Sequence, residues 1–341
     1  MSLYATEDVT DAFHATKAFL TDLDLPQWFR LAVIALLTGG VSAPSSSFQF
    51  NGGTPTNPSS PTGTPGDFPT FGFAQSDLVA FAVALLALAV LIGLLLWIAG
   101  SILQFAFVDA LATGRVAIRR NLREHWWKGF QLFLFSLAVA FVVIGAFLLA
   151  LAPLLAGVFG VLFVILLLPV AAVVGILAAV VDGFTRAFVV PIMLREDRNV
   201  LSAWSRLWGV LRANFKEYGA FVLLNLALTI GAGIVTGIGA ILVAIVVAIP
   251  IGIVFGLPFV LAGASGTLAW AWLAIGLLVG GLAFLLGIGL VNVPVQSYLR
   301  YYALFLLGDT DADLDLIPDR RAAARDSEEP SEAGGSETAE E

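Results

Sequence analysis

The chain has 341 residues, of which 59% are hydrophobic and 12% are charged, and its formal net charge is −8. A soluble domain carries roughly 25% charged residues, so this composition excludes a water-soluble globular protein. There is no cysteine, which excludes disulfides, thiol nucleophiles and zinc–thiolate sites.

Long uncharged stretches divide the chain into membrane-spanning segments. Apolar runs of at least ~18 residues are long enough to cross a bilayer as helices. The pattern predicts an all-α, polytopic transmembrane helical bundle with about six spans in three hairpins, held in a domain covering residues 27–308. The predicted spans occupy residues 27–43, 78–108, 130–152, 167–191, 219–249 and 268–307.

The N-terminal segment, residues 1–26, is predicted to be an amphipathic helix. Apolar residues recur at helical spacing, but the polar positions hold acids such as Glu7 and Asp8. An interfacial helix attracted to anionic lipid is rich in Lys and Arg on its polar face, so docking on the protein itself is the better interpretation. A helix of this kind also precedes the second and third hairpins, near residues 113–127 and 199–215.

The first span is short, and its apolar part from Phe29 to Val41 also has the length of a signal-peptide core. Val41, Ser42 and Ala43 even resemble a cleavage site. The preceding segment is long and acidic, whereas a signal peptide begins with a short positive region. An uncleaved span is therefore favoured over a cleaved leader.

The distribution of cations predicts the topology. Residues 44–76 are rich in Pro, Gly, Ser and Thr and contain no Lys or Arg, whereas residues 109–129 and 192–217 hold most of the cations. Loops rich in Lys and Arg face the cytoplasm. We therefore expect a multi-pass protein of the cell membrane, with both termini cytoplasmic and the 44–76 loop outside.

Prolines complicate two of the uncharged stretches. Pro153 and Pro169 are expected to interrupt the second hairpin, and Pro250 and Pro258 lie in the middle of the third. Residues 250–267 could form a re-entrant cap buried against protein, or an extra pair of short helices.

The C-terminal segment, residues 309–341, accounts for the acidity of the whole chain. It holds 12 acids and three arginines, which leaves a net charge of +1 for the rest. Such a segment has too little apolar surface to fold alone. It is predicted to be a disordered cytoplasmic tail that solvates the protein or docks a partner.

Polar groups at helix ends form the candidate site. Asp182 and Arg186 are four residues apart and can pair along one helix face, and other polar residues end the second and sixth spans. If these helices converge, one cluster results that either fixes helix packing or lines a vestibule for a solute. The candidate cluster comprises Gln104, Asp109, Asp182, Arg186, Asn292, Gln296 and Arg300.

No residue pattern points to catalysis, to a metal or to a cofactor. His14 and His125 are the only histidines, and no phosphate-binding glycine loop is present. We expect a non-enzymatic protein that organises the membrane or binds partners, with a transporter or channel for a small solute as the alternative. The expected partners are the lipid bilayer and either a protein bound by the acidic tail or a second copy of the chain; nucleic acid is not expected.

Several features together resemble a known but uncharacterised group. They are the segment from Asp182 to Pro191, the Trp204 and Trp208 surface helix, and a short first span before a Pro/Ser/Thr loop. This combination resembles an uncharacterised family of haloarchaeal six-span membrane proteins, and more distantly the membrane region attached to some glycerophosphodiester phosphodiesterases. The resemblance implies an integral membrane protein of unknown role, and the chain departs from the phosphodiesterases in lacking a catalytic domain. The use of 14 arginines but only three lysines is also similar to proteins of salt-loving archaea.

Overall fold

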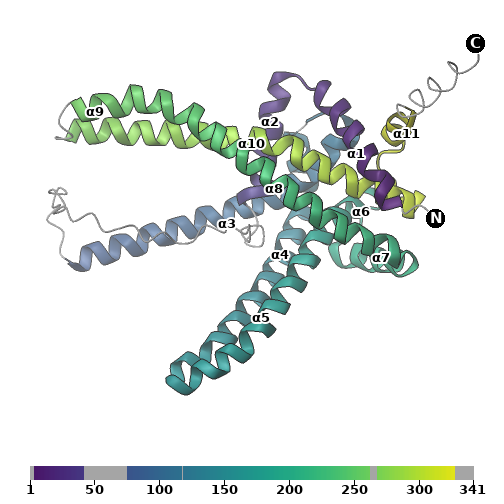
Figure 1. The fold of residues 1–341 in the computed structure, drawn as a ribbon, viewed down its shortest axis with the longest axis horizontal. Helices are drawn as coiled ribbons and strands as arrows, with labels where there is room; N and C mark the ends of the chain where they lie inside the picture. Colours follow the sequence, from purple (N-terminus) through teal and green to yellow (C-terminus); the bar gives the residue numbers. More distant parts are fainter. Residues whose placement is uncertain (1–3, 42–74, 117, 262–266, 327–341) are drawn as a thin grey trace, which may run out of the picture.

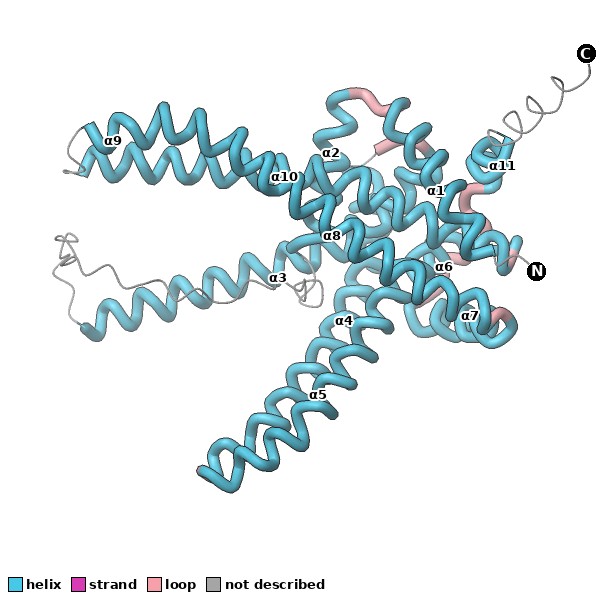
Figure 2. Tube along the Cα trace, in the orientation of Figure 1, coloured by secondary structure: helices cyan, strands magenta, loops and turns pink. Residues whose placement is uncertain are grey.

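The computed structural model describes residues 4–41, 75–116, 118–261 and 267–326. Every regular element in these four ranges is a helix, as Figure 2 shows. The predicted all-α class is thereby confirmed for the described part of the chain. The predicted outer loop, residues 44–76, lies almost wholly outside the described residues.

Five of the helices are long: α3 (Gln75–Thr113), α4 (Ile118–Leu151), α5 (Val158–Phe184), α8 (Phe215–Ile251) and α10 (Thr267–Thr310). The shorter α-helices are α1 (Tyr4–Thr21), α2 (Leu25–Leu36), α6 (Val190–Arg195), α7 (Val200–Ala213), α9 (Leu257–Leu261) and α11 (Pro318–Asp326). Single turns of π-helix or 3₁₀-helix join them: η1 (Leu37–Val41), η2 (Ala152–Ala156), η3 (Thr185–Val189), η4 (Gly252–Gly256) and η5 (Ala312–Leu314).

Five helical stretches of the described residues are long and apolar enough to cross a membrane. They contain α3, α4, α5, α8 with α9, and α10. The first predicted span corresponds to α2 and η1, whose apolar part, Leu25–Gly39, is shorter than the other five. The six predicted segments thus appear as five long helices and one short one.

The long helices diverge from a common base as three separate arms (Figure 1). The first arm is α3 alone, the second is the α4/α5 pair, and the third pairs α8, η4 and α9 with α10. At the base, α1, α6, α7 and α11 surround the ends of α3, α4, α8 and α10; we call this assembly the hub. The α2 helix packs on α10 beside the hub.

Aromatic packing holds the hub together. Phe221 of α8 stacks on Tyr302 of α10, with ring centroids 5.1 Å apart, and meets Phe188 of η3 at 4.9 Å. The Tyr301 hydroxyl donates to the Leu111 carbonyl at 2.9 Å, which joins α10 to α3. These side chains are fully buried, whereas large apolar residues along the arms are exposed.

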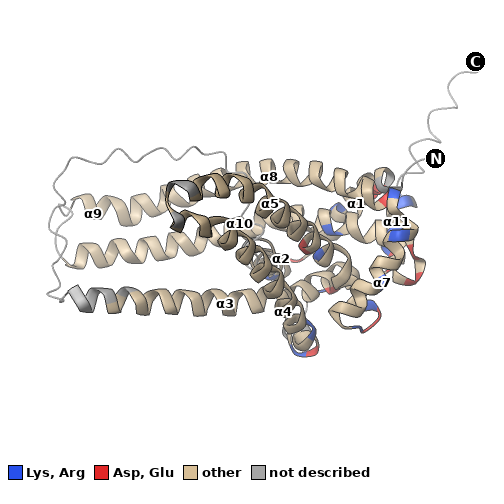
Figure 3. Cartoon of the chain, turned by 90° about the horizontal axis from the view of Figure 1, so that it is seen from below, with Lys and Arg blue, Asp and Glu red and all other residues tan. Residues whose placement is uncertain are grey.

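The charged residues are distributed unevenly between the hub and the arms. Figure 3 shows the Lys, Arg, Asp and Glu residues gathered at the hub, while the described parts of the arms are almost entirely uncharged. Since bare apolar helices are stable in lipid but not in water, the arms have the composition of membrane segments and the hub that of a water-facing end.

Pro153 lies in η2, the turn between α4 and α5, as the sequence pattern predicted, but Pro169 and Pro250 do not interrupt their helices. Pro169 lies inside α5, so this helix begins at Val158 rather than near residue 167. Pro250 lies inside α8, and the helical path continues through η4 and α9 to Leu261. Within the described residues, the stretch after Pro250 is therefore neither a re-entrant cap nor a separate pair of short helices. Neighbouring helices allow proline inside membrane helices.

The two cation-rich loops are mostly helical. The predicted loop 109–129 consists of the end of α3, a short turn and the start of α4, and the loop 192–217 contains α7. The predicted amphipathic helix near residues 113–127 is therefore wrong as a separate element, because its residues continue directly into the second arm. The predicted helices at residues 1–26 and 199–215 are present as α1 and α7.

The C-terminal prediction is wrong in its first half. Residues 309–326 fold against the hub as η5 and α11, and Leu314, Ile317 and Ala324 are buried there. The physical reason is that a few apolar residues and the arginines of α11 complement the hub. Residues 327–341 lie outside the described part of the chain.

Candidate functional site

A group of polar side chains lies where η1, η3 and α10 meet at the base of the arms. We call Thr38, Asp182, Arg186, Gln296 and Arg300 the polar junction. Arg186 Nε lies 2.9 Å from Asp182 Oδ2, and both side chains are less than one-fifth exposed. The predicted pair one helical turn apart is therefore formed.

The backbone of η3 explains the position of Arg300. Val190 N–H donates to the Thr185 carbonyl, five residues back, as in a π-helix. The next bond of this kind would join residue 191 to the Arg186 carbonyl, but Pro191 has no N–H. Arg300 Nη1 donates to this carbonyl instead. A side chain of α10 thus satisfies a backbone group that proline leaves without a donor.

The other bonds of the junction reach the first short helix. Gln296 Nε2 donates to the Ala35 carbonyl at 3.1 Å, and the Thr38 hydroxyl lies 3.2 Å from Gln296 Oε1. Arg186 Nη1 donates to the Thr38 carbonyl at 3.4 Å. The junction therefore ties η1, the end of α5 and the middle of α10 into one unit.

The remaining candidate residues lie apart from these bonds. Asp109 lies 3.7 Å from Arg120 at the start of α4. Gln104 is buried in α3, and its Oε1 has no hydrogen-bond partner among the described residues. Asn292 is half-buried on α10, one turn before Gln296. The structure thus brings together four of the seven predicted residues and adds Thr38, which no sequence pattern singles out.

A second polar group, missed from the sequence, joins α1, α10 and α11. We call Asp8, Asp11, Asp309, Asp315, Arg321 and Arg325 the carboxylate cluster. Arg325 contacts Asp309 at 2.6 Å and Asp11 at 3.1 Å, and Arg321 contacts Asp309 at 2.6 Å and Asp315 at 2.5 Å. The only sequence signal was the i,i+4 spacing of the two arginines within an otherwise acidic segment.

Asp8 is the most deeply placed acid of the carboxylate cluster. Its side chain is fully buried, and the nearest cation, Arg325 Nη2, is 3.6 Å away. Burial and the neighbouring Asp309 raise the pKa of Asp8 to about 8. The α1 helix therefore turns acids of its polar face toward the hub.

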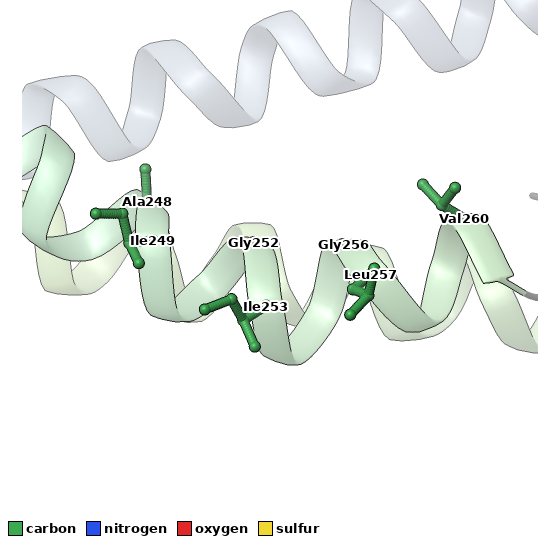
Figure 4. Close-up of a pocket in the computed structure, with 7 residues that line it drawn as sticks. All are labelled: Ala248, Ile249, Gly252, Ile253, Gly256, Leu257 and Val260. Carbon is green, nitrogen blue, oxygen red and sulfur yellow. The ribbon is translucent and has the colours of Figure 1, made fainter.

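Two apolar hollows lie on the arms. One, of about 530 Å³, is a shallow depression along one face of α8, η4 and α9 that contains only apolar residues and glycines (Figure 4). The other, of about 660 Å³, is a groove between α4 and α5. One end of this groove is formed by Trp97, Ser136, Asp182 and Arg186, so it meets the polar junction.

The contacts of the polar junction link helices to one another. Most junction groups bond one another or a backbone carbonyl, which is typical of a structural contact. Among the described residues, no three His, Asp or Glu side chains are grouped so that they could hold a metal ion.

Comparison with known proteins places the chain in a family. A family model described as "Family of unknown function (DUF7544)" matches residues 3–317. The chain belongs to the DUF7544 family. The matched region covers the polar junction and all three arms, and it ends directly before α11. No curated protein and no solved structure matches the chain.

Proposed function

We propose that this DUF7544 protein is a non-enzymatic, multi-pass membrane protein that organises lipid around three splayed arms. The observation that carries the proposal is the exposure of the arms. In the most apolar stretch of each long helix, only 0% to 11% of the residues are buried within the protein. Lipid would therefore surround each arm separately, instead of surrounding one compact bundle.

The lengths of the helices agree with tilted arms. From Thr267 to Gln296, before it enters the hub, α10 has 30 residues and a length of ~45 Å at 1.5 Å per residue. The hydrocarbon core of a bilayer is ~30 Å thick. A helix longer than the hydrocarbon core is accommodated by tilting. Arms that diverge from one base point in different directions, so they cannot all lie along the membrane normal.

The hub is proposed to face the cytoplasm. Its cations include Arg120, Arg123 and Lys128 on α4 and Arg206 and Arg212 on α7, and the bias of Lys and Arg toward the cytoplasmic side gives the orientation. Helix α1 and the end of α10 both belong to the hub, so both termini are proposed to lie inside. A salt-adapted, haloarchaeal source accords with the arginine-rich, acidic composition and belongs to the same proposal.

Transport is the less favoured function. A carrier usually keeps binding groups near the membrane midplane, between helices that enclose them. In this chain the polar junction lies at the base of the arms, where its groups bond one another. That arrangement favours a fixed connection between helices over a vestibule for a solute.

The proposal is tested by counting the lipids held at the protein surface. The purified protein is reconstituted in vesicles with a spin-labelled phospholipid, and the motionally restricted fraction is measured by electron paramagnetic resonance. We expect more restricted lipids per protein than for a compact six-helix membrane protein of similar mass. A number equal to that of the compact control would mean that the arms close together, which would contradict the proposal.

A further inference from the structure

The groove between α4 and α5 has the form of a site for one lipid chain. It extends along α4 from Ser136 to Leu151 and from Ala172 in α5 to Arg186 in η3. Fifteen residues of helix correspond to ~22 Å, which exceeds the ~15 Å of hydrocarbon in one leaflet. The groove is therefore long enough for a full acyl chain.

The lining changes from apolar to polar along this length. Val143, Phe147 and Ile176 are typical of its walls, whereas Trp97, Ser136 and the Asp182–Arg186 pair occur only at the hub end. Tryptophan and arginine are the residues that meet lipid headgroups at the edge of a membrane. An amphiphile with its chain in the groove would place its headgroup beside Arg186.

Charge selects the kind of headgroup. Asp182 neutralises one of the two arginines of the polar junction, which leaves a formal charge of +1 from Arg186 and Arg300. The Thr38 carbonyl accepts a hydrogen bond from Arg186 Nη1, and Asp182 Oδ2 lies 2.9 Å from Arg186 Nε as an ion-pair partner, whereas a guanidinium has five N–H groups. A guanidinium with donors to spare is well suited to bind phosphate oxygens.

We propose that this groove binds one acyl chain of an anionic phospholipid from the hub-side leaflet, with the lipid phosphate bound by Arg186. The inference rests on the proposed function only in placing the arms in a bilayer. In lipid the groove cannot stay empty without loss of van der Waals contacts along its walls. The polar end then favours an anionic lipid over the bulk lipid.

The test fills the groove with protein atoms. Gly175 lines it, and a methyl group added there would lie 3.7 Å from the Phe147 ring, an ordinary contact. Gly175→Leu should therefore fold and occupy the space of the chain. The matched control is Gly145→Leu on α4, where an added group meets nothing within 4 Å and which is not part of the lining.

Native mass spectrometry of the detergent-purified protein measures the retained lipid, using phosphatidylglycerol and phosphatidylcholine as probes. We expect wild type and Gly145→Leu to retain one phosphatidylglycerol, in preference to phosphatidylcholine. The amount of phosphatidylglycerol that Gly175→Leu retains should be at least five-fold lower. Arg186→Lys should lose part of it, because a lysine keeps the charge but not the planar set of donors.

Three results would overturn the inference. Retention by Gly175→Leu equal to wild type would show that the acyl chain lies elsewhere. Equal retention of the two lipids would show that charge does not select the headgroup. Displacement of the lipid by inorganic phosphate alone at equal concentration would show that the acyl chain does not contribute to binding. The count of restricted lipids should be the same in Gly175→Leu and wild type, so failure of this site is distinguishable from failure of the proposed function.

Discussion

The guanidinium of Arg325 on α11 lies 2.6 Å from the carboxylate of Asp309, the residue before the last one of α10. The same guanidinium reaches Asp11 at 3.1 Å. The end of the third arm and the N-terminal helix are thereby joined by a residue from a segment whose composition is that of a solvated tail. Some acids of that segment therefore form ion pairs within the fold instead of facing solvent.

We predict that Arg325→Ala destabilises the protein. The change leaves Asp8, Asp11 and Asp309 with less compensating charge, and the loss of a partner for buried acids should cost about 1–3 kcal/mol, a value reduced because the Arg325 side chain is 45% exposed. Thermal unfolding in detergent measures the effect. Arg123→Ala, at an exposed position of α4, serves as the control and should unfold like wild type.

Truncation separates the two halves of the C-terminal segment. Removal of residues 318–341 deletes α11 and should lower the unfolding temperature, because Arg321 and Arg325 leave with it. Removal of residues 327–341 keeps all of α11 and should have little effect. Equal behaviour of the two truncated proteins would mean that the contacts of α11 do not contribute to stability.

The stability of the hub should depend on pH through Asp8. Its pKa is raised from 3.8 to about 8 by burial and by Asp309, with Asp11 adding to the rise and Arg325 opposing it. An acid with a raised folded-state pKa stabilises the fold below its unfolded pKa, and this contribution is lost as pH rises toward 8. The free energy of unfolding should therefore fall between pH 5 and pH 8, by at most ~1.4 kcal/mol per pH unit for this group, and the unfolding temperature should fall with it.

Asp8→Asn isolates this contribution, because the amide does not titrate and has nearly the same shape. We expect a flatter pH profile for the variant than for wild type over the same range. Parallel profiles would assign the pH dependence to another group.

The sequence predicted those parts of the fold that depend on local pattern. Long apolar runs located the arms, and helical spacing of apolar residues located α1 and α7. The inward position of Asp8 and Asp11 could not be predicted, because it depends on Arg325, more than 300 positions later in the chain. Local composition marks acids as solvent-facing, and only the tertiary fold supplies the buried countercharge.

The candidate site was predictable to a similar extent. Helical spacing predicted the pair of Asp182 and Arg186, and the placement of Gln296 and Arg300 near a helix end led to their inclusion. Thr38 was not predictable, since its contacts arise from the approach of η1 to α10. Asp109 was wrongly grouped, because the direction in which α4 leaves the hub places Arg120 beside it.

The Asp182–Arg186 pair can be tested by a double-mutant cycle. Arg186→Ala should destabilise the protein by about 1–3 kcal/mol, since it leaves Asp182 without its cation in a mostly buried position. The double variant with Asp182→Ala should recover part of that loss. Strict additivity of the two single changes would show that the pair contributes no coupling energy.

Close approach of α2 and α10 requires glycine at position 289. A methyl group there would lie 2.7 Å from the Ala32 carbonyl oxygen, so α2 would have to move. Gly289→Ala should cost about 1–3 kcal/mol, in spite of the better helix propensity of alanine. Gly281→Ala on the same helix, where an added methyl meets nothing within 4 Å, should be neutral or stabilising.

The central claim is that the arms remain apart in a membrane. Because the chain has no cysteine, Leu155→Cys at the tip of the second arm and Leu261→Cys near the tip of the third can be spin-labelled without background. Both side chains are exposed, at 94% and 77%. We predict that double electron–electron resonance in lipid vesicles gives one distance far longer than the ~10 Å between packed helices. A short distance typical of a closed bundle would contradict the account.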